Sequence, residues 1–72
     1  MKRRLVILGG GESGVGAALL AKKEGYKVVL MDEGSLKEGY RKELADAGIE
    51  FIEQGIDENG RKYYKIYYEH EA

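Results

Sequence analysis

A glycine-rich motif carries the residues with the clearest chemical potential. Gly9, Gly11 and Gly14 have the spacing Gly-x-Gly-x-x-Gly directly after the apolar run at 5–8, and Asp32 follows the next apolar run, 18 residues beyond Gly14. In dinucleotide-binding loops the first glycine permits a tight turn, the second lets the backbone approach a pyrophosphate, and the third lets the helix pack close to the strand. The motif predicts a phosphate-binding loop, with Asp32 accepting hydrogen bonds from a ribose or a base.

The residues around the motif refine this prediction. Ser13 can cap the following helix or donate its hydroxyl to a phosphate, whereas Glu12 places an anion in the loop and must point to solvent if a phosphate binds. Glu33 follows Asp32 where an arginine would favour a 2′-phosphate, so NADP is disfavoured against NAD or a uridine nucleotide. The alternative interpretation is a glycine-rich turn that serves packing alone.

Groups for catalysis or metal binding are scarce in the sequence. The chain has no cysteine and a single histidine, His70, and its 72 residues leave room for one small domain without a second lobe. We therefore expect no catalytic residue, no metal site and no enzyme. The 12 basic and 13 acidic residues are interspersed, with a net charge of −1, which argues against nucleic acid and membrane partners.

The elements that position the glycine motif follow from apolar periodicity. Strands are expected over 5–8, 27–31 and 49–54. One helix is expected from Ser13 to about Glu24, ending at Gly25. A second is expected to begin at a Ser35-x-x-Glu38 capping box, to place Leu36, Tyr40, Leu44 and Ala47 on one stripe, and to end at Gly48. Right-handed crossovers make the three strands parallel and place both helices on one face.

The C-terminal part departs from this alternation. Asn59-Gly60 predicts a two-residue type I′ turn, which pairs Ile56 with Tyr63, Ile52 with Tyr67 and Phe51 with Tyr68. Residues 61 to about 69 then form an antiparallel edge strand. The predicted fold is an α/β half-Rossmann unit, βαβαββ, with strand order 4-3-2-1. The tyrosines at 63, 64, 67 and 68 could offer a stacking platform, but a hairpin edge of high β propensity is the favoured interpretation.

Residues 3 to about 54 also resemble a known family. The stretches 4–18 (RLVILGGGESGVGAA), 31–34 (MDEG) and 48–51 (GIEF) are similar to the N-terminal domain of the Mur ligases that add D-glutamate to UDP-N-acetylmuramoyl-L-alanine. The resemblance implies a Rossmann-like domain that binds the UDP part of the substrate. It further implies that Glu12, Ser13 and Gly14 contact the diphosphate, and that Asp32 with Glu33 contacts the uracil. Catalysis in that family requires a central ATP-binding domain and a third domain.

The resemblance ends near Gln54. Residues 55–72 replace the family's next parallel strand with a hairpin strand, and the chain lacks proline. We therefore interpret residues 1–72 as a single half-domain: an engineered or recombined scaffold without catalysis, binding a uridine diphosphate nucleotide or NAD weakly at most. Two alternatives are a genuine UDP- or NAD-binding module and a fragment of a UDP-N-acetylmuramoyl-alanine:D-glutamate ligase.

The predicted topology leaves one sheet face without helices. Candidates for the uncovered side are Leu5, Ile7, Val29, Met31, Ile52 and Ile56. A bare apolar face, or the free edge of the first strand, predicts a homodimer. No apolar run approaches the length of a membrane span or a signal peptide, so a cytoplasmic or purely recombinant protein is expected.

Overall fold

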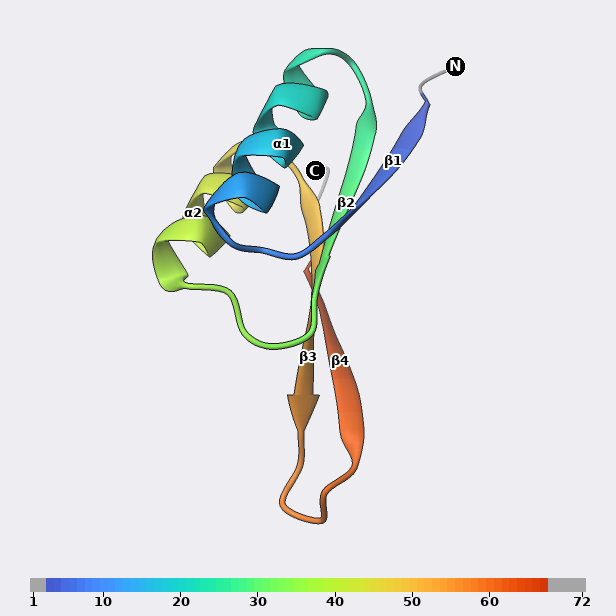
Figure 1. Cartoon of the computed structure of the whole chain (residues 1–72), viewed down its shortest axis with the longest axis vertical. Helices are drawn as coiled ribbons and strands as arrows, with labels where there is room; N and C mark the ends of the chain where they lie inside the picture. The colour runs from blue at the N-terminus through green and yellow to red at the C-terminus, as the bar shows by residue number, and fades with distance from the viewer. Residues whose placement is uncertain (1–2, 68–72) are drawn as a thin grey trace, which may run out of the picture.

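A computed structural model describes residues 3–67 of the chain (Figure 1). In chain order its elements are β1 (Arg4–Leu8), α1 (Glu12–Lys23), β2 (Lys27–Asp32), α2 (Glu38–Asp46), β3 (Glu50–Ile56) and β4 (Lys62–Tyr67). The strands form one sheet in the order β1-β2-β3-β4, in which the first three strands are parallel and β4 is antiparallel to β3. The predicted half-Rossmann topology is confirmed.

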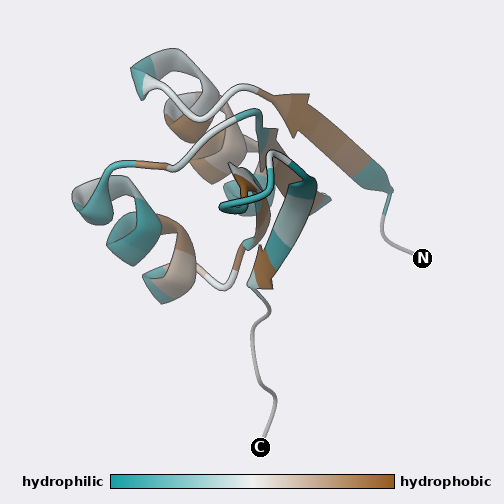
Figure 2. Cartoon of the chain, turned by 90° about the horizontal axis from the view of Figure 1, so that it is seen from below, coloured by the Kyte–Doolittle hydropathy of each residue, from teal (hydrophilic) through white to brown (hydrophobic). Residues whose placement is uncertain are grey.

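Both helices lie on the same face of the sheet, as Figures 1 and 2 show from two directions. Strand residues of one parity point toward the helices, because successive side chains alternate between the two faces. On the central strands β2 and β3 this parity includes the buried Val28, Leu30, Phe51 and Glu53. The core consists of buried apolar residues from both helices, β2, β3 and the connections: Val15, Ala18, Ala21, Val28, Leu30, Leu36, Leu44, Ile49 and Phe51. The partly buried residues Ile7, Leu19, Tyr26, Tyr40, Ala47 and Tyr67 pack against them.

Glycines end both helices as predicted. Gly25 has a φ of +95° and Gly48 a φ of +72°, the left-handed conformation that glycine adopts without strain. After α1, the Gly25 N–H donates to the Lys22 carbonyl and the Tyr26 N–H to the Ala21 carbonyl. This pair of hydrogen bonds satisfies carbonyls that the last helical turn would otherwise leave without partners.

The predicted capping box at Ser35 is wrong. Helix α2 begins at Glu38, its N-terminal cap is Lys37 in an extended conformation, and no side chain caps it. The Leu36 N–H instead donates to the Glu53 carboxylate on β3, at 2.6 Å. This contact keeps Leu36 out of the helix, although its side chain still joins the core.

The predicted two-residue turn is also wrong, by one residue. The structure pairs Ile56 with Lys62, Ile52 with Ile66 and Phe51 with Tyr67, and the Asp57 N–H donates to the Arg61 carbonyl. Residues 57–61 lie between the two strands, and the hydrogen bond from Asp57 to Arg61 closes a three-residue loop, 58–60. The Asp57 carboxylate accepts the amides of Asn59 and Arg61, and only Gly60 has positive φ, at +78°. These features favour a type I turn followed by a left-handed glycine over type I′.

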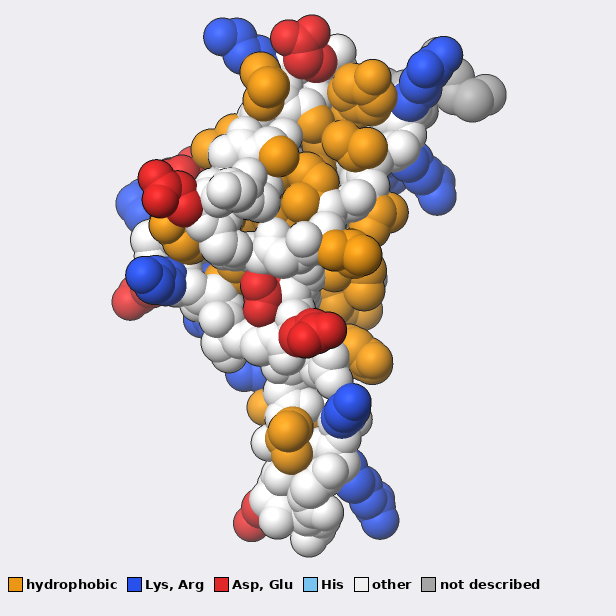
Figure 3. All heavy atoms as spheres, in the orientation of Figure 1, with side chains coloured by type: hydrophobic (Ala, Val, Ile, Leu, Met, Phe, Trp, Pro, Cys, Tyr) orange, Lys and Arg blue, Asp and Glu red, His pale blue; other side chains and the backbone are white. Residues whose placement is uncertain are grey.

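The open face of the sheet, opposite the helices, carries exposed apolar side chains. Leu8, Met31, Ile52 and Ile66 are paired across all four strands, and we call them the open row. Leu8 is 79% exposed and Ile66 is 47% exposed. In Figure 3, hydrophobic side chains follow the border of the molecule away from the helices.

The placement of Leu5 and Ile7 on the uncovered side is wrong. Leu5 pairs with Val28 and Ile7 with Leu30, which puts both on the helix-covered face. The strand begins one residue earlier than predicted, at Arg4, and Val6 and Leu8 face the open side instead. Within residues 3–67, no helix is both long enough and apolar enough to cross a membrane.

Candidate functional site

The loop between β1 and α1 has the geometry that its glycines predict. Gly9 has a φ of +103° and its N–H donates to the Met31 carbonyl at 2.7 Å, which ties the end of β1 to β2. A Cβ at Gly14 would collide with the Gly9 carbonyl oxygen, so only glycine permits this close approach of helix and loop. A Cβ at Gly11 would have no atom within 4 Å, so the backbone there is open to an approaching ligand.

The start of α1 presents unpaired backbone amides to this open space. Gly11 is the N-terminal cap, no side chain caps the helix, and the Val15 N–H donates to the Gly11 carbonyl. The amides of residues 12–14 precede that hydrogen bond and have no partner within the helix. Glu12 and Ser13 are exposed, and Ser13 does not act as the predicted cap. The amides and the helix dipole together favour an anion here.

Asp32, at the end of β2, is a structural clamp for the loops. One carboxylate oxygen accepts the Gly10 N–H at 2.6 Å and the other accepts the Gly34 N–H at 2.8 Å. A carboxylate has about four lone-pair sites, so Asp32 retains capacity for a ribose hydroxyl or a base N–H. Its neighbour Glu33 is exposed.

Two residues that shape the loop were missed by the sequence reasoning. Gly10 is buried, and a Cβ there would collide with the Leu36 side chain and approach the Asp32 carboxylate. Leu36, in the connection before α2, thus packs directly against the glycine loop. The signal that could have found Gly10 is a glycine between Gly9 and Gly11, at a position where the Gly-x-Gly-x-x-Gly spacing accepts any residue.

A buried ion pair holds the connection that carries Leu36. The Glu53 side chain is 1% exposed and lies 2.7 Å from the Arg41 Nη2, while its second oxygen accepts the Arg41 Nε–H at 2.9 Å and the Leu36 amide. Burial acts to raise the pKa of Glu53, but the hydrogen bonds from Arg41 and Leu36 outweigh it and leave the pKa below its usual value. The hydrogen bond to Glu53 raises the pKa of Arg41.

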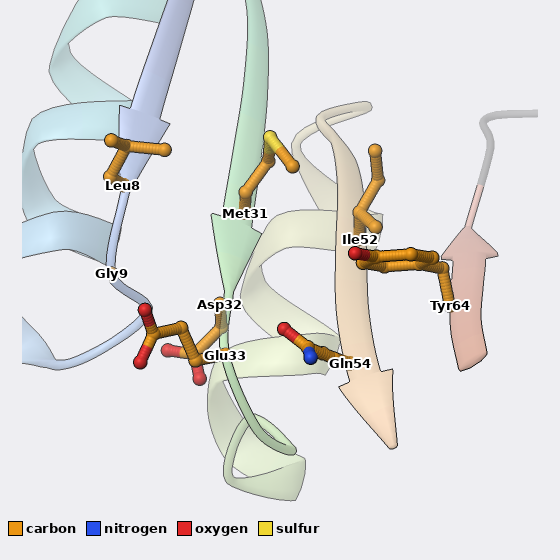
Figure 4. A pocket seen from close by; sticks show the side chains of 8 residues that line it. All are labelled: Leu8, Gly9, Met31, Asp32, Glu33, Ile52, Gln54 and Tyr64. Atoms are coloured by element: carbon orange, nitrogen blue, oxygen red, sulfur yellow. The ribbon is translucent and has the colours of Figure 1, made fainter. Parts of the chain in front are cut away.

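A pocket of about 540 Å³ lies on the open face, at the carboxyl ends of the parallel strands (Figure 4). Its lining combines three members of the open row with polar groups and one ring: Leu8, Met31 and Ile52 with Gly9, Asp32, Glu33, Gln54 and Tyr64. Ligands of open α/β sheets bind outside the carboxyl ends of the strands, where the strand order reverses; this pocket lies at the same ends of a sheet whose strand order does not reverse.

The structure divides the predicted site residues into two neighbouring groups. Gly9, Asp32 and Glu33 line the pocket on the open face. Gly11, Glu12, Ser13 and Gly14 form the cap and first turn of α1. Gln54 and Tyr64 also line the pocket, and the sequence analysis did not assign them to the site.

Known proteins resemble the part of the chain that carries this site. A protein of Christiangramia forsetii is 50% identical over 54 residues, and one of Cytophaga hutchinsonii is 52% identical over 56 residues. A third, of Porphyromonas gingivalis, is 45% identical over 53 residues. All three are named UDP-N-acetylmuramoylalanine–D-glutamate ligase. About three quarters of this chain is homologous to the N-terminal region of these ligases.

The homology covers a small part of each ligase. The matched residues are 75%, 78% and 74% of this chain, and they span 12% of the length of each of the three ligases. The family resemblance drawn from residues 3 to about 54 is thereby confirmed. No family model matches the chain, and no solved structure matches it at a significant level.

The expectation that the chain is not an enzyme is corrected by this comparison. The relatives are named as ligases, and the residues that match them make up 75% and 78% of this chain. That expectation rested on the lack of histidine and cysteine near the loop and on the short chain. Neither observation excludes an enzyme, because a homologous segment lies within a protein named as a ligase. The 54 matched residues are only 12% of that ligase.

Proposed function

We propose that this chain is the N-terminal nucleotide-binding part of a UDP-N-acetylmuramoylalanine–D-glutamate ligase, and that its glycine loop binds the diphosphate of a UDP-linked substrate. The single observation that carries the proposal is the homology to ligases whose name includes a UDP-linked substrate. The loop geometry supports it independently, since the backbone at Gly11 is open and the first amides of α1 lie beside it.

The proposed binding uses backbone groups more than side chains. A phosphate oxygen accepts the amides of residues 12–14, and the positive end of the helix dipole stabilises its charge. The Ser13 hydroxyl is exposed and adds one further donor. Glu12 is exposed, so water screens its carboxylate and weakens its repulsion of an anion in this loop.

The test is an NMR titration with UDP, with NAD as the competing nucleotide. We expect UDP to shift the backbone amide signals of residues 9–14 more than NAD does at equal concentration. Gly11→Leu places a side chain in the open space before the helix and abolishes these shifts. Gly16→Leu is the matched control, because Gly16 also has open space around its Cβ position but lies on the exposed surface of α1, beyond its first turn.

Two results would contradict the proposal. One is the absence of amide shifts in residues 9–14 with UDP at millimolar concentration. The other is an equal loss of binding in Gly11→Leu and Gly16→Leu, which would place the ligand elsewhere. A stronger response to NAD than to UDP would retain phosphate binding but reject the ligase substrate as its ligand.

A further inference from the structure

The glycine loop is supported from behind by a buried carboxylate. We propose that Glu53 of β3 is a positioning residue for this loop and holds it in the conformation that presents the first amides of α1 to an anion. Glu53 acts through Leu36, whose backbone amide its carboxylate binds and whose side chain packs against Gly10. The inference rests on the proposed function for the identity of that anion.

The connection between β2 and α2 is tied to the glycine loop at two points. Asp32 accepts the Gly10 amide with one carboxylate oxygen and the Gly34 amide with the other, at 2.6 and 2.8 Å. The Leu36 side chain is the second tie, because a Cβ at Gly10 would collide with it. The position of residues 33–37 therefore acts directly on the position of Gly10.

Glu53 fixes the far end of this connection. The Leu36 N–H donates to the Glu53 carboxylate at 2.6 Å, across 17 residues of the chain. Both residues are buried, so the amide would lose its partner without gaining water if the carboxylate were removed. The Gly34 amide ties the connection to β2 and the Leu36 amide ties it to β3. Removing the carboxylate would release the second of these ties.

Arg41 of α2 pairs with the same carboxylate but does not touch the connection through it. Its Nη2 lies 2.7 Å from one Glu53 oxygen, and its Nε–H donates at 2.9 Å to the oxygen that also accepts the Leu36 amide. A change at either partner breaks the ion pair. Only a change at Glu53 removes the acceptor of the Leu36 amide, so the two residues can be tested against each other.

The stability of the core does not require a carboxylate at position 53. The Glu53 side chain is 1% exposed among apolar neighbours, and replacing a buried ion pair by apolar side chains of similar volume is often neutral or stabilising. What a carboxylate provides and a leucine lacks is an acceptor for the Leu36 amide. This difference is the reason for assigning Glu53 to the loop as well as to the core.

The test compares Glu53→Leu with Arg41→Met as its matched control. Inorganic pyrophosphate is titrated into each full-length folded variant, and the amide signals of residues 11–14 are followed by NMR. We expect Glu53→Leu to weaken pyrophosphate binding about fivefold, a typical coupling between separate sites, and Arg41→Met to change it by less than about twofold. The charge changes alone predict the reverse order, because losing a carboxylate favours an anion and losing a guanidinium disfavours it.

The Gly10 amide offers a readout that needs no ligand. Its hydrogen exchange is compared with that of the Leu30 amide in β2, which reports general unfolding. Glu53→Leu should speed Gly10 exchange about tenfold relative to Leu30, whereas a merely structural loss would speed both together. Leu36→Ala should have the same selective effect, and adding Glu53→Leu to it should change little more, because both act through one contact.

The conservative variant Glu53→Gln keeps one oxygen for the Leu36 amide, so it should weaken pyrophosphate less than Glu53→Leu does. Equal effects of Glu53→Leu and Arg41→Met on pyrophosphate would overturn the inference, as would parallel exchange of Gly10 and Leu30. If Glu53→Leu does not fold, Leu36→Ala decides, and unchanged Gly10 exchange in it would overturn the inference.

The same measurements keep the inference apart from the proposed function. Absence of pyrophosphate shifts at residues 11–14 in the unmodified chain would reject the diphosphate site. A selective rise in Gly10 exchange in Glu53→Leu would still support the positioning of the loop by Glu53. Pyrophosphate shifts that Glu53→Leu leaves unweakened would support the diphosphate site and overturn the positioning role.

Discussion

Two adjacent rows of side chains cross all four strands, and they differ sharply in burial. The covered row consists of Ile7, Leu30, Phe51 and Tyr67, and the open row of Leu8, Met31, Ile52 and Ile66. On β2, Leu30 is 0% exposed and the following residue, Met31, is partly exposed. On β1, Ile7 is partly buried and the following residue, Leu8, is 79% exposed. The two rows have similar apolar character, so their composition does not explain the difference in burial. The difference arises because the two helices cover only one face of the sheet.

The comparison separates stability from binding within one small sheet. The covered row closes the core and lies beside the buried Glu53, whose polar atoms are all paired. The open row contributes the floor of the pocket and an exposed apolar surface. Substitutions in the covered row should therefore act on the free energy of unfolding, and those in the open row on association and ligand binding.

The largest expected effect is at the centre of the covered row. Leu30→Ala should reduce the free energy of unfolding by about 3 kcal/mol, because it removes a fully buried side chain and leaves a cavity. Met31→Ala, on the next residue of the same strand, should cost less than about 1 kcal/mol, because Met31 is partly exposed. Urea denaturation of both variants measures the difference. Similar losses would contradict the distinction between the two faces.

The next effect concerns the ion pair on the covered side. Glu53→Gln should cost about 2 kcal/mol, below the usual range for a buried pair because the Arg41 side chain is 34% exposed and regains water contacts. Asp46→Asn, which breaks the exposed Lys42–Asp46 pair, should cost less than about 0.5 kcal/mol. Thermal and urea unfolding at pH 7 compare them, and equal losses would show that burial adds nothing.

The same pair predicts a pH dependence with a definite sign. The pKa of Glu53 is lower in the folded chain than its usual value of 4.5, so the unfolded chain binds more protons just below that pH. Stability from this group is complete above pH 4.5 and is lost as the pH falls through the lower, folded-state pKa. Glu53→Gln should flatten the decline in stability below pH 4.5. An unchanged acid slope in the variant would contradict this assignment.

The smallest effect on stability, and the largest on association, is expected at the end of the open row. The predicted homodimer places a second copy of the chain on this face or along the free edge of β1. Leu8→Glu should dissociate it while changing the free energy of unfolding by less than about 0.5 kcal/mol. Leu20→Glu, on α1 at 61% exposure, is the control. Sedimentation velocity at high micromolar concentration tests both, and a monomeric unmodified chain would refute the dimer.

Local patterns predicted the parallel part of the fold well. The apolar runs, the glycines after each helix and the glycine spacing after β1 depend on neighbours within a few residues, and the structure has each of them in place. The start of α2 could not be predicted in this way. Its capping box was displaced by a hydrogen bond from Leu36 to Glu53, 17 residues away in the chain. Such non-local partners leave no periodic signal in the sequence.

The candidate site was predicted in part for the same reason. The glycines and Asp32 follow a known spacing, so sequence reasoning found them, although it assigned Asp32 to the ligand without its role as a loop clamp. Gln54 and Tyr64 join the pocket only through strand pairing, which the one-residue error in the hairpin obscured. Neither the homology nor the fold bears on an engineered origin, which stays a prediction.

The three-residue hairpin loop has a consequence for how this edge could vary. Deleting Glu58 would leave Asn59-Gly60 as a two-residue loop between Asp57 and Arg61, the loop length for which this dipeptide is best suited. The pairs from Ile56–Lys62 to Phe51–Tyr67 would then be retained, and Tyr64 would stay on the open face. Deleting a residue within β4 instead would exchange the two sides of the strand, so this edge tolerates length changes in the loop but not in the strand.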